Sequence, residues 1–109
     1  MDGTNARIVL TTCDNPHEAT RLARTLVEER LAACATIIPR VESIYRWEGA
    51  IESGTETLLL LKTASAQVDA LRDRLLALHS YQTPEFLVLD VAGGSAGYLA
   101  WLLASVGKA

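Results

Sequence analysis

The chain has 109 residues, 50% of them hydrophobic and 21% charged, and its formal net charge is −3 at pH 7. This size and composition predict a single soluble domain over residues 1–109, with a core that needs neither metal nor disulfide support. The negative charge and the scatter of the ten basic residues argue against a nucleic-acid partner.

No segment of the sequence predicts a membrane partner or secretion. No apolar run is long enough to span a bilayer, and residues 1–9 lack the pattern of a signal peptide. The two cysteines, Cys13 and Cys34, form no disulfide framework, and their spacing matches no zinc ribbon. We therefore expect a protein of the reducing cytoplasm.

The first third of the chain predicts a strand and then a helix. Residues 6–13 are β-branched and apolar, which is typical of a strand buried on both faces. Asn15 is expected to cap a helix, with Pro16 at its first position and Glu18 completing a capping-box-like pair. Apolar residues then recur at helical spacing, which predicts a helix over residues 16–32.

The middle of the chain predicts a hairpin of two long strands. Residues 34–47 are strand-like, and Pro39 within them favours a bulge or an edge position. Glu48 and Gly49 form the expected turn, and residues 50–63 return as the partner strand.

The last third predicts a helix, a strand and a short helix. We expect the second helix to be capped by Thr63 or Ser65, and residues 86–91 to form the fourth strand. The third helix should cover residues 96–106 and stop at Gly107. The order β-α-β-β-α-β plus a C-terminal helix is typical of a ferredoxin-like α+β fold, an antiparallel sheet with two helices on one face.

The predicted first helix is much shorter than the strand that follows it. A first helix of about 16 residues covers roughly 24 Å. A continuous strand over residues 33–47 would run roughly 50 Å, so the long central hairpin should extend more than about 10 Å beyond the helices. Because its end carries apolar side chains, we expect another subunit to cover it; these are Ile44, Tyr45, Trp47, Ile51 and part of the run Leu58–Leu61.

Two short motifs fit patterns of catalysis or metal binding. GGSAG, residues 93–97, matches the nucleophile elbow of hydrolases, but no Asp, Glu or His follows Ser95. We therefore expect a loop in which Ser95 caps the last helix. Cys13 and His17 are four residues apart and would suit a thiophilic metal; the alternative is a partly buried thiol beside a solvated histidine.

The stretch HSYQTPE, residues 79–85, concentrates polar side chains in one short connection. In a structural interpretation, Ser80 and Thr83 satisfy backbone groups and Pro84 holds the approach to the next strand. In a functional interpretation, the loop forms the rim of a binding site. The residues alone leave both interpretations open.

Several stretches, in order, resemble one known family. They cover roughly residues 7–105 and are ERLAACATIIP (29–39), SIYRWEGAIE (43–52), LLLLKT (58–63), HSYQTPEFLVLDV (79–91) and GYLAWL (97–102). On these stretches the chain resembles CutA, the divalent-cation tolerance proteins. The resemblance implies a CutA-like domain in a tight homotrimer, similar in architecture to the PII signalling proteins. It also implies a cytoplasmic location, association with copper or another divalent cation, and no enzymatic activity.

The resemblance also implies a set of metal ligands. Copper-binding members place a cysteine at the end of the first strand, a glutamate on the third strand and a histidine near the end of the second helix. Here Glu56 matches the glutamate, Thr11 stands at the cysteine position with Cys13 two residues on, and His79 is the best-placed histidine. Glu56, His79 and Cys13 are therefore the expected ligands. Ser80 replaces the usual proline of the family, so we expect a less rigid loop.

The leading interpretation is a trimeric cation-binding protein linked to metal tolerance. Two other kinds of function stay open beside it. A PII-like sensor would bind a small anionic metabolite between subunits, with His79, Tyr81 and Lys62 as donors to its carboxylate or phosphate. In the cation-binding interpretation, Glu85 and Glu56 would instead add hard oxygen donors for the metal ion beside His79. A trimeric scaffold that only docks other proteins is the third possibility. We expect the polar residues to converge at one subunit interface, and we expect no organic cofactor.

Overall fold

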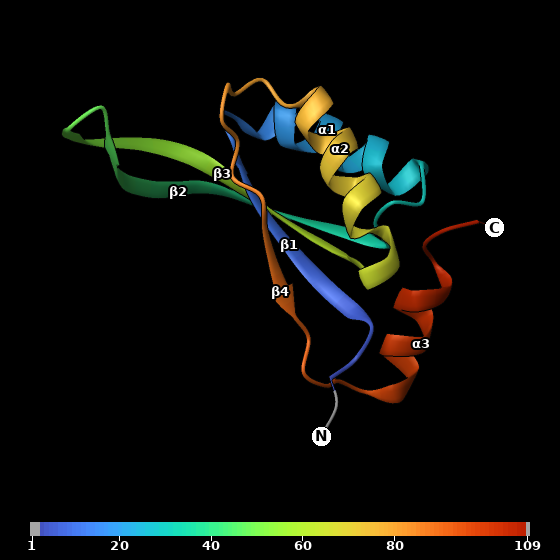
Figure 1. The fold of residues 1–109 in the computed structure, drawn as a ribbon. Coiled ribbons are helices and arrows are strands. Elements are labelled where there is room, and N and C mark those ends of the chain that lie inside the picture. The colour runs from blue at the N-terminus through green and yellow to red at the C-terminus, as the bar shows by residue number, and fades with distance from the viewer. Residues whose placement is uncertain (1–2, 109) are drawn as a thin grey trace.

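Four strands and three α-helices make up residues 3–108, the part of the chain that the computed structural model describes. The strands are β1 (Ala6–Cys13), β2 (Cys34–Trp47), β3 (Ala50–Ala64) and β4 (Leu87–Asp90). The helices are α1 (Pro16–Glu28), α2 (Val68–Leu78), which follows a short 3-10 turn over Ser65–Gln67, and α3 (Ala96–Ala104). The predicted α+β class and order of elements are confirmed (Figure 1). The prediction of one domain also includes Met1, Asp2 and Ala109, which lie outside the described residues.

The four strands form one antiparallel sheet in the order β2-β3-β1-β4. Helices α1 and α2 lie together on one face of it (Figure 1). Alternate residues of a strand point to the same face, so every second residue of β1 and β3 meets these helices. The fully buried residues of this layer include Val9, Leu59, Leu61, Leu22, Leu26, Leu71 and Leu75. Burying each such side chain stabilises the fold by about 1.5–3 kcal/mol.

The opposite face of the sheet is only partly covered within one chain. Ile8 and Leu10 of β1 are half-buried there, and Leu89 and Leu87, their partners on β4, are about half exposed. The predicted burial of β1 on both faces therefore holds for one face of the single chain. The reason is that α1 and α2 both pack on the other side.

Helix α1 ends at Glu28, four residues before the predicted end. Arg30 adopts a left-handed backbone conformation with φ of 61°, which stops the helical path. The N–H groups of Leu31 and Ala32 turn back and donate to the carbonyl of Leu26, at 3.0 and 3.2 Å. The helical spacing of apolar residues continues past the point where the backbone leaves the helix, which explains the error.

The predicted caps of the later helices are wrong. Neither Thr63 nor Ser65 caps α2, because the short turn Ser65–Gln67 comes first and α2 begins without a side-chain cap. The Thr63 hydroxyl instead donates to the carbonyl of Leu31 at 2.7 Å. Ser95 occupies the cap position of α3, but its side chain makes no cap hydrogen bond.

Two boundaries near the C-terminus also differ slightly from the prediction. Strand β4 is shorter at both ends than the predicted residues 86–91. Helix α3 ends at Ala104 rather than at residue 106. Gly107 follows with φ of 77°, as expected of a glycine after a helix, and its N–H donates to the carbonyl of Arg30 at 2.9 Å.

Strands β2 and β3 form a hairpin that projects beyond the helices (Figure 1). Its register shifts between Ile38 and Val41, so the bulge predicted at Pro39 is confirmed. Glu48 and Gly49 make the turn with φ of 49° and 81°, the left-handed values that a two-residue hairpin turn requires.

The projecting end of the hairpin exposes four of the apolar side chains expected there, whereas Leu59 and Leu61 of the expected run lie in the core under the helices. Ile44 is 67% exposed, Ile51 62%, Trp47 50% and Tyr45 47%. The predicted overhang is therefore present, and its covering by another subunit stays a prediction.

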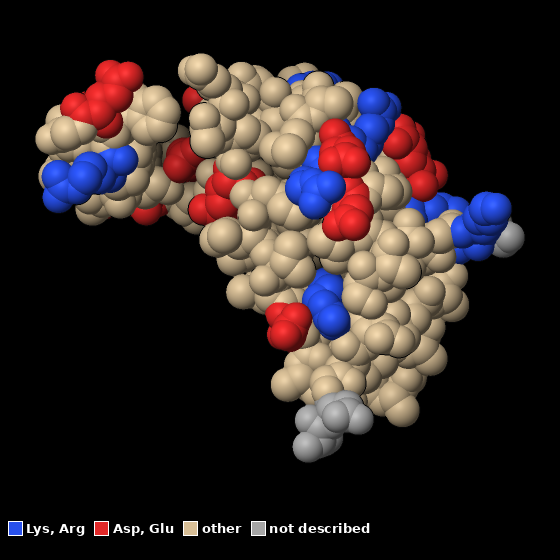
Figure 2. Space-filling view, in the orientation of Figure 1, with Lys and Arg blue, Asp and Glu red and all other residues tan. Residues whose placement is uncertain are grey.

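Charged side chains on the surface are mixed in sign. Figure 2 shows acidic and basic groups side by side, and on this face the described residues form no extended basic patch. Arg74 pairs with Glu29 at 2.9 Å, and Arg72 pairs with Asp69 and Asp73. Within residues 3–108, no helix has the length and apolar character needed to cross a membrane.

Candidate functional site

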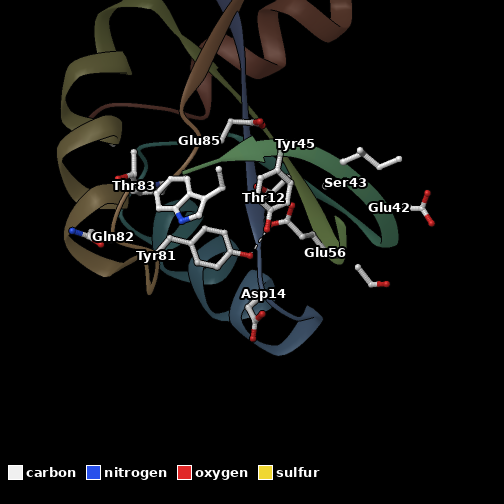
Figure 3. Close-up of a pocket in the computed structure, with 15 residues that line it drawn as sticks. Thr12, Asp14, Glu42, Ser43, Tyr45, Glu56, Tyr81, Gln82, Thr83 and Glu85 are labelled. Carbon is white, nitrogen blue, oxygen red and sulfur yellow. Dashed lines mark hydrogen bonds between the residues drawn. The ribbon is translucent and has the colours of Figure 1, made fainter. Parts of the chain in front are cut away.

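The overhanging hairpin and the loop after α2 are the two walls of an open groove of about 990 Å³ (Figure 3). Residues 81–85 form one wall, and residues 42–45, 47 and 54–56 of the hairpin form the other. Thr12, near the end of β1, and Asp14, just after it, line the groove between the two walls. The loop that carries HSYQTPE therefore lines a cavity, as the functional interpretation predicts.

Tyr81 joins the two walls. Its hydroxyl donates to Oε2 of Glu56 at 2.6 Å (Figure 3). Burial, together with this hydrogen bond and the negative charge of Glu56, raises the pKa of Tyr81. The phenol is therefore a stable donor at neutral pH, and it holds the Glu56 carboxylate at the edge of the groove.

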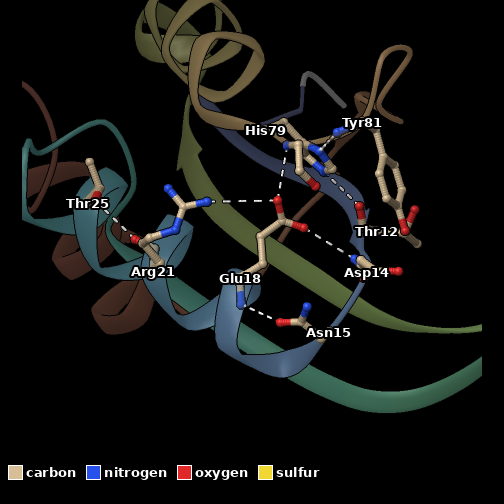
Figure 4. A network of polar contacts seen from close by, with 9 residues as sticks. Thr12, Asp14, Asn15, Glu18, Arg21, Thr25, His79 and Tyr81 are labelled. Carbon is tan, nitrogen blue, oxygen red and sulfur yellow. Dashed lines mark hydrogen bonds and ion pairs between the residues drawn. The ribbon is translucent and has the colours of Figure 1, made fainter.

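His79 is buried directly behind Tyr81, and backbone groups engage both of its ring nitrogens. The Tyr81 N–H donates to Nδ1 at 3.0 Å, and Nε2 lies 2.8 Å from the carbonyl oxygen of Thr12 (Figure 4). Because Nδ1 accepts, the proton that the Thr12 carbonyl requires is on Nε2. The ring of His79 also packs against the ring of Tyr81, with 4.8 Å between centroids.

Glu18, in the first turn of α1, ties the same loop to the β1–α1 connection (Figure 4). Its Oε2 accepts the N–H of Ser80 at 3.0 Å and its Oε1 accepts the N–H of Asp14 at 3.3 Å. Burial works to raise the pKa of Glu18, but hydrogen bonds from Ser80 and Asp14 outweigh it and bring the pKa below its ordinary value. The predicted helix cap is confirmed, since Asn15 accepts the N–H of Glu18 at 2.8 Å.

Cys13, Glu18 and His79 form a buried cluster from three different elements. The Cys13 sulfur, a Glu18 carboxylate oxygen and a His79 ring nitrogen lie within 4.8 Å of one another. Burial, with a smaller contribution from the charge of Glu18, raises the pKa of Cys13 to about 12. The thiol is therefore protonated at neutral pH, and a metal ion that bound it would have to displace this proton.

The donor set of this cluster fits a soft or borderline divalent cation. Thiolate and imidazole suit copper and zinc, and a carboxylate is a common third ligand. Ligation by His79 would require one ring nitrogen to give up its hydrogen bond with the backbone of Thr12 or Tyr81. Glu18 could keep its bonds to Ser80 and Asp14, because each carboxylate oxygen has a second lone pair.

The structure brings together most of the residues that the sequence proposed. Glu56, Tyr81 and Glu85 line the groove, and Cys13 and His79 lie in the cluster behind it. Glu56 is not part of that cluster, and Glu18 takes its place as the carboxylate.

Three other residues considered in the sequence analysis belong to neither the groove nor the cluster. Lys62 does not reach the groove, because it lies six residues along β3 from Glu56, and its Nζ is 3.3 Å from the Tyr98 hydroxyl of α3. His17 is exposed on α1, away from the buried Cys13. Thr11 is buried on the same face of β1 as Cys13, and its hydroxyl has no hydrogen-bond partner among the described residues.

Glu18 is the residue that the sequence interpretation missed as part of a site. Its place three residues after Asn15 indicated only a capping pair. The sequence nevertheless contained a signal for this site. Glu18 lies in the first helical turn, five residues after Cys13 at the end of a strand, and a side chain in that turn faces back toward the strand end. The partner His79 is 61 positions away in the sequence, and only the fold brings the two together.

Comparison with known proteins identifies the family. The sequence model of the family described as "CutA1 divalent ion tolerance protein" matches residues 7–105. The chain belongs to the CutA1 family.

Similar CutA1 proteins come from bacteria and plants. The chain is 44% identical over 100 residues to "Divalent-cation tolerance protein CutA" of Thermus thermophilus, covering 92% of this chain and 97% of that one. A solved structure of a divalent cation tolerance protein from Thermus thermophilus superimposes with a TM-score of 0.91 at 43% identity, covering 94% and 99% of the two chains. "Protein CutA, chloroplastic" of Arabidopsis thaliana is 41% identical over 95 residues. That match covers 87% of this chain but only about half, 52%, of the plant protein.

Ser80 stands where the resemblance to CutA implies a proline, and its backbone makes a bond that a proline could not make. The backbone N–H of Ser80 donates to Glu18, and a proline at this position has no N–H to donate. The expectation that Ser80 makes the loop less rigid stays a prediction, and this bond works against it. In this chain Glu18 and Ser80 act as a pair that fixes the loop.

Proposed function

We propose that this protein binds a divalent cation and contributes to divalent-cation tolerance, with Cu²⁺ as the ion that its donor set suits best. The observation that carries the proposal is the cluster of Cys13, Glu18 and His79, whose ligand atoms lie within 4.8 Å of one another. A thiolate and an imidazole favour copper over the hard cations Mg²⁺ and Ca²⁺. The names of the CutA relatives, which refer to divalent-cation tolerance, support the same role.

The cluster predicts a binding reaction that releases a proton. Because the Cys13 pKa is raised to about 12, the metal competes with a proton for the sulfur. The apparent affinity should therefore fall by up to about tenfold for each pH unit that the solution is acidified. Glu18 is already ionised near neutral pH and supplies a negative charge without competing with a proton.

The protein is also proposed to be a homotrimer. Two exposed apolar surfaces support an assembly: the end of the hairpin, around Ile44 and Trp47, and the open face of the sheet at Leu87 and Leu89. Apolar areas of this kind are rarely left in water on a monomer. The number three follows from the resemblance to the trimeric CutA proteins. The expected cytoplasmic location and the expected lack of enzymatic activity stay predictions, and one relative is named as chloroplastic.

Metal titrations of the wild type, of two cysteine variants and of His79→Ala test the proposed binding site. Co²⁺ bound to a thiolate absorbs strongly in the near ultraviolet, so it reports directly on ligation by sulfur. We expect this absorption in the wild type and in Cys34→Ser, the matched control, and we expect Cys13→Ser to lose it. Cu²⁺ affinity measured by calorimetry should fall in Cys13→Ser and in His79→Ala. Equal binding by all four proteins would contradict the proposed site.

The alternative of a sensor for an anionic metabolite receives no support from the groove. Its lining includes the carboxylates of Asp14, Glu42, Glu56 and Glu85, and no Lys or Arg is among the described residues that line it. Lys62, the cation expected to bind an anion, lies beside Tyr98 instead. The charge of this groove favours cationic ligands.

A further inference from the structure

The backbone around His79 decides which of its two ring nitrogens can bind a metal ion. Nε2 lies 2.8 Å from the carbonyl oxygen of Thr12, and Nδ1 accepts the N–H of Tyr81 at 3.0 Å (Figure 4). These two bonds assign the proton of the neutral ring to Nε2 and the free lone pair to Nδ1. A neutral imidazole binds a metal through its unprotonated nitrogen, so Nδ1 is the ligand atom of His79.

The bond between Nε2 and Thr12 is one that a metal-bound histidine needs. Histidines that bind metals almost always donate the N–H of their second nitrogen to a carbonyl, a carboxylate or water, which fixes the ring and makes the ligand nitrogen more basic. Thr12 supplies this carbonyl from β1, directly before Cys13. The ring can therefore keep this bond when a cation binds, and only the Nδ1 side has to change.

On the Nδ1 side, the backbone of Tyr81 occupies the lone pair that the cation needs. Its N–H donates to Nδ1, and its ring packs against the ring of His79 with 4.8 Å between centroids. A lone pair holds one hydrogen-bond donor or one metal ion, so a cation must displace this N–H. The backbone around residue 81 therefore has to move away from His79 when the site is filled.

The hydroxyl of Tyr81 resists this movement. It donates to the carboxylate of Glu56 on β3 at 2.6 Å (Figure 3), and hydrogen bonds to charged acceptors are among the stronger ones. Metal binding at Nδ1 therefore works against a contact that lies outside the cluster of Cys13, Glu18 and His79. All of these contacts lie within one chain, so they do not depend on which surfaces a neighbouring subunit covers.

We propose that the contact of Tyr81 with His79 is autoinhibitory: it closes the empty metal site and opens when a cation binds Nδ1. This inference rests on the proposed function and adds the regulation of the same site. Because coupling between two contacts is reciprocal, the bond between Tyr81 and Glu56 lowers the affinity for the cation, and the bound cation loosens that bond. Occupancy of the buried cluster is thereby transmitted to Glu56, which lies on the hairpin opposite Val41.

Co²⁺ titration of the assembled protein, read by the thiolate absorption, tests the autoinhibitory contact. Tyr81→Phe keeps the ring against His79 and removes the hydroxyl that anchors it, so we expect this variant to bind Co²⁺ about threefold or more tightly than the wild type. Tyr98→Phe removes the same group from an exposed tyrosine of α3 and should bind like the wild type. In a Glu56→Ala background, Tyr81→Phe should change the affinity by less than about twofold, because the bond is already absent. Equal or weaker binding by Tyr81→Phe, or the same gain in the Glu56→Ala background, would overturn the proposal.

Hydrogen exchange of the wild type gives a second readout that needs no variant. Exchange should slow in the segments that carry Cys13 and Glu18 when Co²⁺ binds, since the metal stabilises their folded arrangement. It should become faster in residues 81–85, because the Tyr81 N–H loses its acceptor. Slower exchange there as well would show that the contact stays closed, and would overturn the proposal.

The same experiments separate this inference from the proposed function. Failure of Co²⁺ to bind Cys13 in the wild type would overturn the proposed function and the inference with it. Binding of Co²⁺ at Cys13 without the effect of Tyr81→Phe and without faster exchange in residues 81–85 would overturn the autoinhibitory contact alone.

Discussion

Glu18 and Ser80 are 62 positions apart in the sequence, and a single hydrogen bond of 3.0 Å joins the carboxylate of one to the backbone N–H of the other. The bond connects the first turn of α1 to the loop that forms one wall of the groove. Beside it, His79 connects the same loop to the Thr12 carbonyl at the end of β1. Two side chains therefore fix the position of Tyr81 and of the residues that follow it.

Ser80→Pro tests the contribution of this bond. The backbone of His79 is extended, with φ of −72° and ψ of 142°, which is compatible with a following proline, so the main loss is the N–H itself. Leaving the Glu18 oxygen without its donor should lower the free energy of unfolding by about 1–3 kcal/mol. Urea denaturation measures this change. Ser80→Ala keeps the N–H and is the control; a proline variant as stable as Ser80→Ala would contradict the assigned role.

The lowered pKa of Glu18 predicts a dependence of stability on pH. A carboxyl group whose pKa is lower in the folded than in the unfolded state stabilises the fold above its unfolded pKa, and this contribution is lost as pH falls through the folded pKa. The loss should therefore begin near pH 4.5, the ordinary value of the group, and continue below it. Glu18→Gln should be less stable than the wild type at pH 7, and the difference should shrink at pH 3. Glu28→Gln, exposed on the same helix, should show no such convergence.

The two cysteines should differ sharply in reactivity. The Cys13 thiol is fully buried and its pKa is raised to about 12, so it has almost no thiolate at pH 8. Cys34 is partly accessible. Alkylation of the native protein with iodoacetamide, read by mass spectrometry, should label Cys34 well before Cys13. In urea both should react at similar rates, and equal rates in the native protein would contradict the burial of Cys13.

Trp47 should matter for assembly more than for the fold of one chain. It is half exposed at the hairpin end, so its truncation leaves no cavity in the core. Light scattering should give a mass near three times 11.8 kDa for the wild type and smaller species for Trp47→Ala. Val27→Ala, an exposed apolar residue of α1, is the control and should stay assembled. A wild type that is monomeric at micromolar concentration would contradict the trimer.

The fold was predictable from local patterns, because each signal spans only a few residues. Examples are the alternation within a strand, the cap Asn15 directly before Pro16, and the bulge at Pro39. Boundaries failed where the backbone leaves the regular path while apolar spacing continues, as at Arg30. The site was predictable only in part. Family resemblance pointed to Cys13 and His79, but the third member of their cluster depends on packing of α1 against the loop after α2, which no local pattern contains.

The pairing of the first strand with the last has a consequence for the order in which the chain folds. Arg7 of β1 lies opposite Asp90 of β4, and Thr4 donates to the carbonyl of Val91 at 3.2 Å. Contacts between such distant positions form slowly, because a long loop must close before they are gained. The edge of β1 that faces β4 is therefore the part of the sheet expected to pair last. Until it pairs, it is an unpaired strand edge between apolar side chains, the kind of edge at which partly folded chains aggregate.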